Sequence, residues 1–133
     1  MLHKDISVEQ IEFWLRENDP EKLQTLWNTA DEIRKRNVGD EVHLRGLVEI
    51  SNFCVRRCKY CGFNADNKKI ERYRMPREEI IDSAKRAHKL GFGTVVIQAG
   101  EDYGLETSWM ADIITHIKTT TPLAVTLSLG ERH

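Results

Sequence analysis

The sequence predicts an α/β fold in which parallel strands alternate with helices. From residue 42 onward the elements follow the order strand, loop, helix, strand, loop, helix, strand, and this order is typical of βαβ units with parallel strands. Residues 94–97 form a short, uninterrupted apolar run, which indicates a strand that is covered on both faces. Three parallel strands are too few to close a barrel, which needs about eight strands and about 250 residues.

Two helices are expected before the first strand. Ser7 and Gln10 have the spacing of a capping box, and an apolar face with a helical period follows them. Asp19 and Pro20 indicate the start of a second helix, because Asp caps helices well and Pro suits the first helical position. Gly39 lies just beyond the expected end of this helix.

The first strand is expected over residues 42–50, where apolar and polar residues alternate. Its apolar members are Val42, Leu44, Val48 and Ile50. Residues 51–75 follow neither a helical nor a strand period, and they hold all the cysteines of the sequence. This segment is therefore interpreted as a long functional loop.

A third helix is expected to begin at Pro76 and to end before Gly91. Its expected buried face consists of Ile80, Ile81, Ala84, Ala87 and Leu90. Apolar residues between 110 and 117 recur with a helical period and predict a fourth helix. The apolar run at 123–129 predicts the last strand.

Composition places the chain among globular proteins and argues against several classes of partner. The sequence is 40% hydrophobic and 31% charged, and its formal net charge of −1 gives no reason to expect a nucleic-acid or membrane surface. No apolar run approaches the roughly 20 residues of a membrane helix, and the first residues lack the apolar core of a secretory signal. The protein is therefore expected in the cytoplasm. The chain stops at residues 130–133, directly after an expected strand, so we expect it to be a fragment of a longer protein.

The three cysteines form a Cys-x3-Cys-x2-Cys pattern at Cys54, Cys58 and Cys61. Disulfide frameworks usually have an even number of scattered cysteines, whereas clustered thiols in a cytosolic protein indicate a metal site. A structural zinc site needs four protein ligands, and the expected loop contains no histidine to complete one. Three thiolates on a four-iron cluster leave one iron open, so the pattern favours a 4Fe-4S cluster. A non-catalytic zinc or iron–sulfur electron-transfer module is the alternative from a different class.

This cysteine spacing, with an aromatic residue before the last cysteine, resembles the signature of the radical S-adenosylmethionine (radical SAM) superfamily. The resemblance implies that the three cysteines hold a 4Fe-4S cluster and that Tyr60 packs near the adenine of S-adenosylmethionine. Ala99, Gly100 and Glu101 are similar to the family's Gly-Gly-Glu segment, whose backbone receives the methionine amino group; Ala99 replaces the first glycine. By the same resemblance Ser128, at the expected end of the last strand, is a ligand of the methionine carboxylate.

The resemblance also implies an activity. An electron from the reduced cluster breaks a carbon–sulfur bond of S-adenosylmethionine, and the products are methionine and a 5'-deoxyadenosyl radical. This radical takes a hydrogen atom from a small-molecule substrate. An electron donor such as ferredoxin or flavodoxin is the implied redox partner. The sequence shows no general base or nucleophilic triad, and radical chemistry needs none to begin, so no catalytic side chain is assigned.

The similarity extends to residues 38–53, 72–75, 98–102 and 126–131, which resemble the radical SAM maturases of iron–iron hydrogenase, the HydE family. This resemblance implies a role in maturation of the hydrogenase active site, with other maturation proteins as partners. The sequence is also similar, less closely, to biotin synthase and methylornithine synthase. A biotin synthase-like or methylornithine synthase-like enzyme that acts on another small molecule is therefore the nearest alternative.

The resemblance also sets the expected domain organisation. The family's catalytic fold is a TIM-type (β/α) barrel that is larger than this chain. Residues 39–133 are accordingly expected to form the N-terminal portion of such a barrel, truncated at its C-terminal side. Residues 1–38 are expected to form a helical extension that precedes it.

Overall fold

The computed structural model describes residues 6–131. It divides the chain into two compact units, with the division between Val42 and His43. No helix among the described residues is both long enough and apolar enough to cross a membrane.

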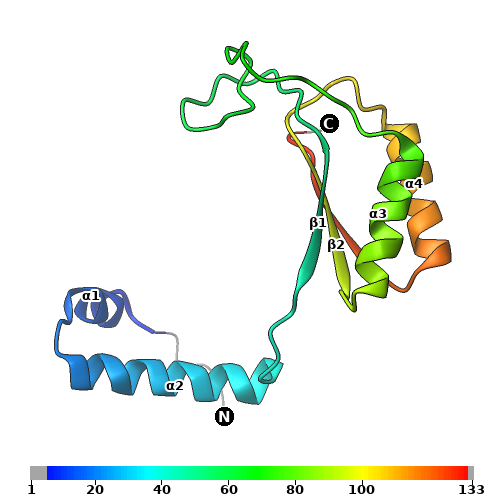
Figure 1. Ribbon diagram of the computed structural model, residues 1–133. Coiled ribbons are helices and arrows are strands. Elements are labelled where there is room, and N and C mark those ends of the chain that lie inside the picture. Colours follow the sequence, from blue (N-terminus) through cyan, green and yellow to red (C-terminus); the bar gives the residue numbers. More distant parts are fainter. Residues whose placement is uncertain (1–5, 132–133) are drawn as a thin grey trace. The chain divides into compact units, whose positions relative to one another are not determined.

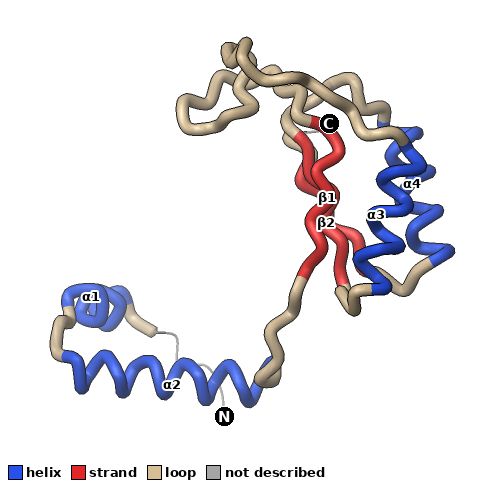
Figure 2. Tube along the Cα trace, viewed as in Figure 1, coloured by secondary structure: helices blue, strands red, loops and turns tan. Residues whose placement is uncertain are grey.

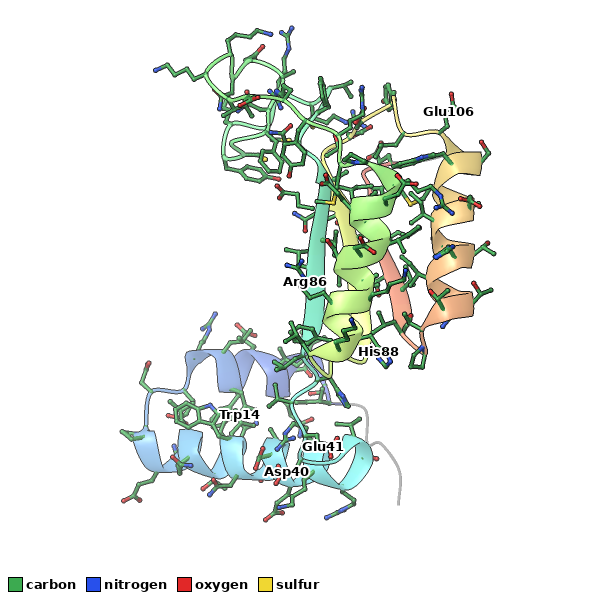
Figure 3. The ribbon with its side chains drawn as sticks, turned by 45° about the vertical axis from the view of Figure 1, so that its right-hand side comes forward. Trp14, Asp40, Glu41, Arg86, His88 and Glu106 are labelled. Carbon is green, nitrogen blue, oxygen red and sulfur yellow. The ribbon has the colours of Figure 1, made fainter. Side chains whose placement is uncertain are left out.

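The first unit contains α1 (Val8–Arg16) and α2 (Pro20–Val38). The predicted capping box is confirmed: the Ser7 hydroxyl accepts a hydrogen bond from the Gln10 N–H at 3.2 Å, and the Gln10 side chain accepts one from the Ser7 N–H at 2.9 Å. Asp19 caps α2 and Pro20 stands at its start, as predicted. Trp14 points from α1 toward α2 (Figure 3) and is half-buried there.

The second unit is built on a three-stranded parallel sheet in the order β1–β2–β3 (Figure 1). The strands are β1 (Arg45–Ser51), β2 (Thr94–Ala99) and β3 (Ala124–Ser128). Neighbours in sequence are neighbours in the sheet, and a helix joins each pair of strands. The predicted βαβαβ order is therefore confirmed.

The two crossover helices, α3 (Arg77–Lys89) and α4 (Thr107–Thr120), lie on the same side of the sheet (Figure 2). This follows because crossovers between parallel strands share one hand. The helices and the facing side of the sheet enclose the apolar core. Its fully buried large side chains are Ile50, Ile80, Val95, Ile97, Ile113, Ile117 and Leu123. The prediction that β2 is covered on both faces is not met within the described residues, where both helices cover the same face.

The predicted start of β1 and one predicted buried position of α3 are wrong. β1 begins at Arg45 rather than at residue 42, and Val42 and Leu44 are 84% and 65% exposed. They lack a partner strand because β2 begins at Thr94, which pairs with Arg45. Leu90 is 68% exposed because it follows the last residue of α3, where the chain turns away through Gly91 at a φ of +85°.

Candidate metal and cofactor site

The segments that follow the three strands meet at the carboxyl edge of the sheet (Figure 1). They are residues 52–76 after β1, residues 100–106 after β2 and residues 129–131 after β3. In Figure 3, Glu106 marks the end of the second segment, where α4 begins. Because carboxyl ends of parallel strands lie at one edge, residues that are far apart in sequence become neighbours here.

The three cysteines lie in the segment after β1, which we call the cysteine loop and define as residues 52–76. Cys54, Cys58 and Cys61 are all free and half-buried. A turn joins the last two, with the Cys61 N–H donating to the Cys58 carbonyl at 3.2 Å. All three thiols therefore remain available as ligands.

The described residues contain no group of three or more His, Cys, Asp and Glu side chains placed to hold a single metal ion. A zinc ion would draw all its thiolates to within about 2.3 Å of one point. In a cluster each cysteine binds a different iron, so the three sulfurs stand farther apart. Three thiols on one loop, with no fourth ligand grouped with them among residues 6–131, are a donor set that fits a 4Fe-4S cluster with one open iron.

Cys54 differs from the other two cysteines in its hydrogen bonds. Its sulfur accepts a backbone N–H from Arg56 and another from Glu101, each at 3.4 Å. The first bond is local, whereas the second comes from the segment after β2. The structure therefore brings the cysteine pattern and the Ala99–Gly100–Glu101 segment together.

Gly100 makes this close approach possible. A Cβ at this position would lie 2.2 Å from the Phe53 carbonyl oxygen and 2.9 Å from the Cys54 Cβ. Backbone hydrogen bonds fix the same contact: the Val55 N–H donates to the Glu101 carbonyl at 3.1 Å, and the Gly100 N–H donates to the Ser51 carbonyl at 3.1 Å. Close packing against Phe53 and Cys54 therefore explains why a glycine occupies position 100 of the predicted Gly-Gly-Glu-like segment. Ala99, which precedes it, is half-buried and is the last residue of β2.

The segment after β3 also reaches Glu101. Gly130 has a φ of +75°, and a Cβ there would lie 2.8 Å from the Glu101 Cγ and 3.0 Å from its Cα. Ser128 is the last residue of β3, and it pairs in register with Gln98 of β2. Its side chain is exposed at the edge of the sheet.

Tyr60 is not brought into this group. Its side chain is 93% exposed on the cysteine loop. The structure thus gathers Cys54, Gly100 and Glu101 directly, places Ser128 at the same edge and leaves Tyr60 facing outward.

Two hydrogen-bond networks that sequence reasoning did not assign hold the cysteine loop in place. In the first, Asp102 is 2% exposed and accepts two hydrogen bonds from Arg74, at 2.7 and 2.8 Å, and one from the Ser51 hydroxyl at 2.6 Å. Burial alone would raise the pKa of Asp102, but the bonds from Arg74, Ser51 and the Gly104 N–H lower it to about 2. The Arg74 guanidinium also lies over the ring of Phe53, the residue directly before Cys54, at 4.2 Å from the ring centroid.

In the second network, the Arg72 guanidinium donates to four backbone carbonyls. It binds those of Phe63 and Asn64, each at 2.7 Å, that of Asn67 at 3.2 Å, and that of Asn52. The Arg72 side chain thus links residues in the middle of the cysteine loop to Asn52 at its start. These links do not depend on a helix or strand within the loop. No spacing in the sequence indicates this role, because the acceptors are main-chain atoms.

A cavity of about 380 Å³ lies beside Cys54, within the volume range of small-molecule sites. It is lined by Phe53, Cys54, Ala65, Asn67, Lys68, Ile70 and Arg72. The cysteine loop therefore folds around a hollow and does not pack flat against the sheet.

Comparison with known proteins identifies the family. The model of the radical SAM superfamily matches residues 48–120, which is more than half of the 133 residues and includes the cysteines and both crossover helices. The chain belongs to the radical SAM superfamily. The predicted family is therefore confirmed.

Individual radical SAM relatives differ in how closely they resemble the chain. It is 47% identical, over 86% of its length, to the [FeFe] hydrogenase maturase subunit HydE of Thermotoga maritima, of which it covers 32%. It is 30% identical, over 83% of its length, to 3-methylornithine synthase of Methanosarcina acetivorans, again covering 32%. The chain thus spans about a third of the length of these curated relatives.

A solved radical SAM structure confirms the fold class. The crystal structure of methylornithine synthase superposes with a TM-score of 0.78 at 26% identity, covering 92% of this chain and 37% of that one. The parallel strands and their crossover helices α3 and α4 therefore correspond to part of a radical SAM (β/α) barrel.

Proposed function

We propose that the protein is a radical SAM enzyme that binds a 4Fe-4S cluster through Cys54, Cys58 and Cys61. The observation that carries the proposal is the set of three free thiols on one loop, at the carboxyl edge of a sheet that belongs to this superfamily. When bound, the cluster with S-adenosylmethionine supplies a reductive cleavage that yields methionine and a 5'-deoxyadenosyl radical. Three cysteines leave one iron of four without a protein ligand, which suits direct binding of a cofactor.

The residues around Cys54 would bind and orient S-adenosylmethionine. The backbone of Ala99, Gly100 and Glu101 runs beside Cys54, where a methionine amino group could be received. Ser128 ends the neighbouring strand and is proposed to bind the methionine carboxylate. Tyr60 is proposed to cover the adenine, a role that requires its exposed ring to pack against the cofactor when it binds.

The specific reaction that we propose is a step in maturation of the iron–iron hydrogenase active site, acting on a small-molecule substrate. The support is the 47% identity to HydE of Thermotoga maritima, against 30% to methylornithine synthase. An electron donor such as ferredoxin or flavodoxin, and other hydrogenase maturation proteins, are the proposed partners. A methylornithine synthase-like reaction on another small molecule is the alternative, supported by the structural match.

Metal analysis of the full-length protein tests the radical SAM proposal. Anaerobic reconstitution should give four irons with sulfide per chain, and the reduced protein should release 5'-deoxyadenosine from S-adenosylmethionine. Cys58→Ala should lose both properties. Lys59→Ala should keep both properties, because Lys59 is an exposed residue between Cys58 and Cys61. Zinc near one per chain, with no 5'-deoxyadenosine, would favour a non-catalytic module instead.

A further inference from the structure

Arg56 stands inside the cysteine pattern, two residues after Cys54, and its side chain leaves the loop to meet two acidic residues. The Arg56 Nε donates a hydrogen bond to a Glu101 carboxylate oxygen. The Arg56 Nη2 donates another to a Glu131 carboxylate oxygen at 2.7 Å. One arginine of the cysteine loop is thus paired with the segments that follow β2 and β3. The hydrogen bond to Glu101 is the main cause of a raised pKa for Arg56.

The Arg56–Glu101 pair is not an ordinary surface ion pair. The Glu101 side chain is 7% exposed, whereas Arg56 is 47% exposed, so a partly exposed guanidinium reaches a buried carboxylate. The Tyr103 hydroxyl donates to the other Glu101 oxygen at 3.1 Å. A buried carboxylate that loses a charged partner is left with a large desolvation cost, so removal of Arg56 should loosen this segment.

The backbone of Glu101 is joined to the same loop. Its N–H donates to the Cys54 sulfur at 3.4 Å, and its carbonyl accepts the Val55 N–H at 3.1 Å. The side-chain pair and the N–H···S bond therefore link the same two segments. A shift of Glu101 would stretch both together.

We propose that Arg56 is a positioning residue that holds the Glu101 N–H on the Cys54 sulfur and so tunes the cluster that this cysteine binds. The inference rests on the proposed function, because it assigns Cys54 to the cluster. Hydrogen bonds to cysteine sulfurs stabilise the more negative, reduced cluster and raise its reduction potential. Loss of Arg56 should accordingly make the cluster harder to reduce.

Arg57 provides a matched control. It is the next residue, has the same charge and is 76% exposed, and it forms an ion pair with Asp66 of its own loop at 3.4 Å. Arg56→Gln and Arg57→Gln each remove one positive charge from the cysteine loop. A general electrostatic effect would be similar in both, whereas a positioning effect belongs to Arg56 alone.

The decisive measurement is the midpoint potential of the cluster in the full-length, reconstituted protein, followed by paramagnetic resonance. Arg56→Gln should lower the potential well below that of Arg57→Gln, and Arg56→Lys should recover part of the loss because its ammonium can still reach Glu101. Equal potentials in the two Gln variants would overturn the inference. A wild-type protein that binds no cluster would instead overturn the proposed function.

A second measurement needs no cluster and covers the case in which Arg56→Gln cannot be loaded. Amide hydrogen exchange in the cluster-free protein reports directly on the segment after β2. Residues 99–103 should exchange faster in Arg56→Gln than in the wild type, and should be unchanged in Arg57→Gln. Unchanged protection in Arg56→Gln would show that Arg56 does not hold Glu101, and the inference would fall.

Discussion

Asp102 joins the segment after β2 to both sides of the cysteine loop, through Ser51, the last residue of β1, and through Arg74 near the end of the loop. Because Asp102 is 2% exposed and ionised, it needs its donors, and together they lower its pKa from 3.8 to about 2. A carboxyl whose pKa is lower in the folded state stabilises the fold above its unfolded pKa. That stabilisation is lost as the pH falls from about 4 toward 2, and it amounts to about 2 kcal/mol.

Asp102→Asn should remove this part of the pH dependence. The free energy of unfolding of the cluster-free protein, measured with urea at pH 6 and at pH 3, should change less with pH in the variant than in the wild type. Asp112→Asn is the control, because Asp112 is 61% exposed and pairs with Arg77 at the surface. An identical pH dependence in the wild type and in Asp102→Asn would contradict the conclusion that the ionised Asp102 carboxylate stabilises the fold.

Gly100→Ala tests the close approach of the segment after β2 to Cys54. The added Cβ would meet the Phe53 carbonyl oxygen at 2.2 Å, and backbone cannot move aside as a flexible side chain can. We expect a loss of about 1–3 kcal/mol in unfolding free energy and weaker binding of S-adenosylmethionine. Gly93→Ala is the control, since a Cβ there meets nothing within 4 Å. Equal stability and binding in the two variants would show that the contact is loose.

At the scale of elements, the cysteine loop contains no helix and none of the three strands. Side-chain hydrogen bonds must therefore hold its conformation. Arg72→Met keeps much of the length of the side chain and removes its bonds to four carbonyls. Charged hydrogen bonds contribute roughly 1.5–3 kcal/mol each, so amide exchange at residues 63–67 should rise roughly tenfold or more. Lys59→Met should leave this exchange unchanged, because Lys59 is exposed on the same loop. If Arg72→Met also left it unchanged, the loop would owe its order to other contacts.

The elements with local signals were the ones predicted well. The capping box of Ser7 and the apolar run of β2 depend on neighbouring residues, which a sequence displays directly. The start of β1 was misplaced because the exposure of Val42 and Leu44 depends on where β2 begins. The pairing of Arg56 with Glu101 was missed for the same reason: 45 positions separate them, and only the parallel sheet brings them together.

At the scale of the molecule, the loops after β1 and β3 both reach Glu101 in the loop after β2, yet they belong to a chain that spans about a third of the length of the relatives it matches. Membership of the superfamily does not define the reaction, because function resides in sites and not in the fold. The maturase proposal therefore rests on the 47% identity to HydE and needs a test in the organism.

Deletion of the gene, in a host that has an iron–iron hydrogenase, supplies that test. If the protein matures this hydrogenase, the hydrogenase polypeptide should accumulate without activity, while biotin synthesis continues. Activity should return with the wild-type gene and with Arg57→Gln, whose exposed side chain lies outside the proposed site. It should not return with Cys58→Ala, because two cysteines cannot hold the cluster in place of three. Normal hydrogenase activity in a deletion strain without a second copy would reject the maturase role. The radical SAM proposal would still stand if the purified protein released 5'-deoxyadenosine, and the methylornithine synthase-like alternative would then lead.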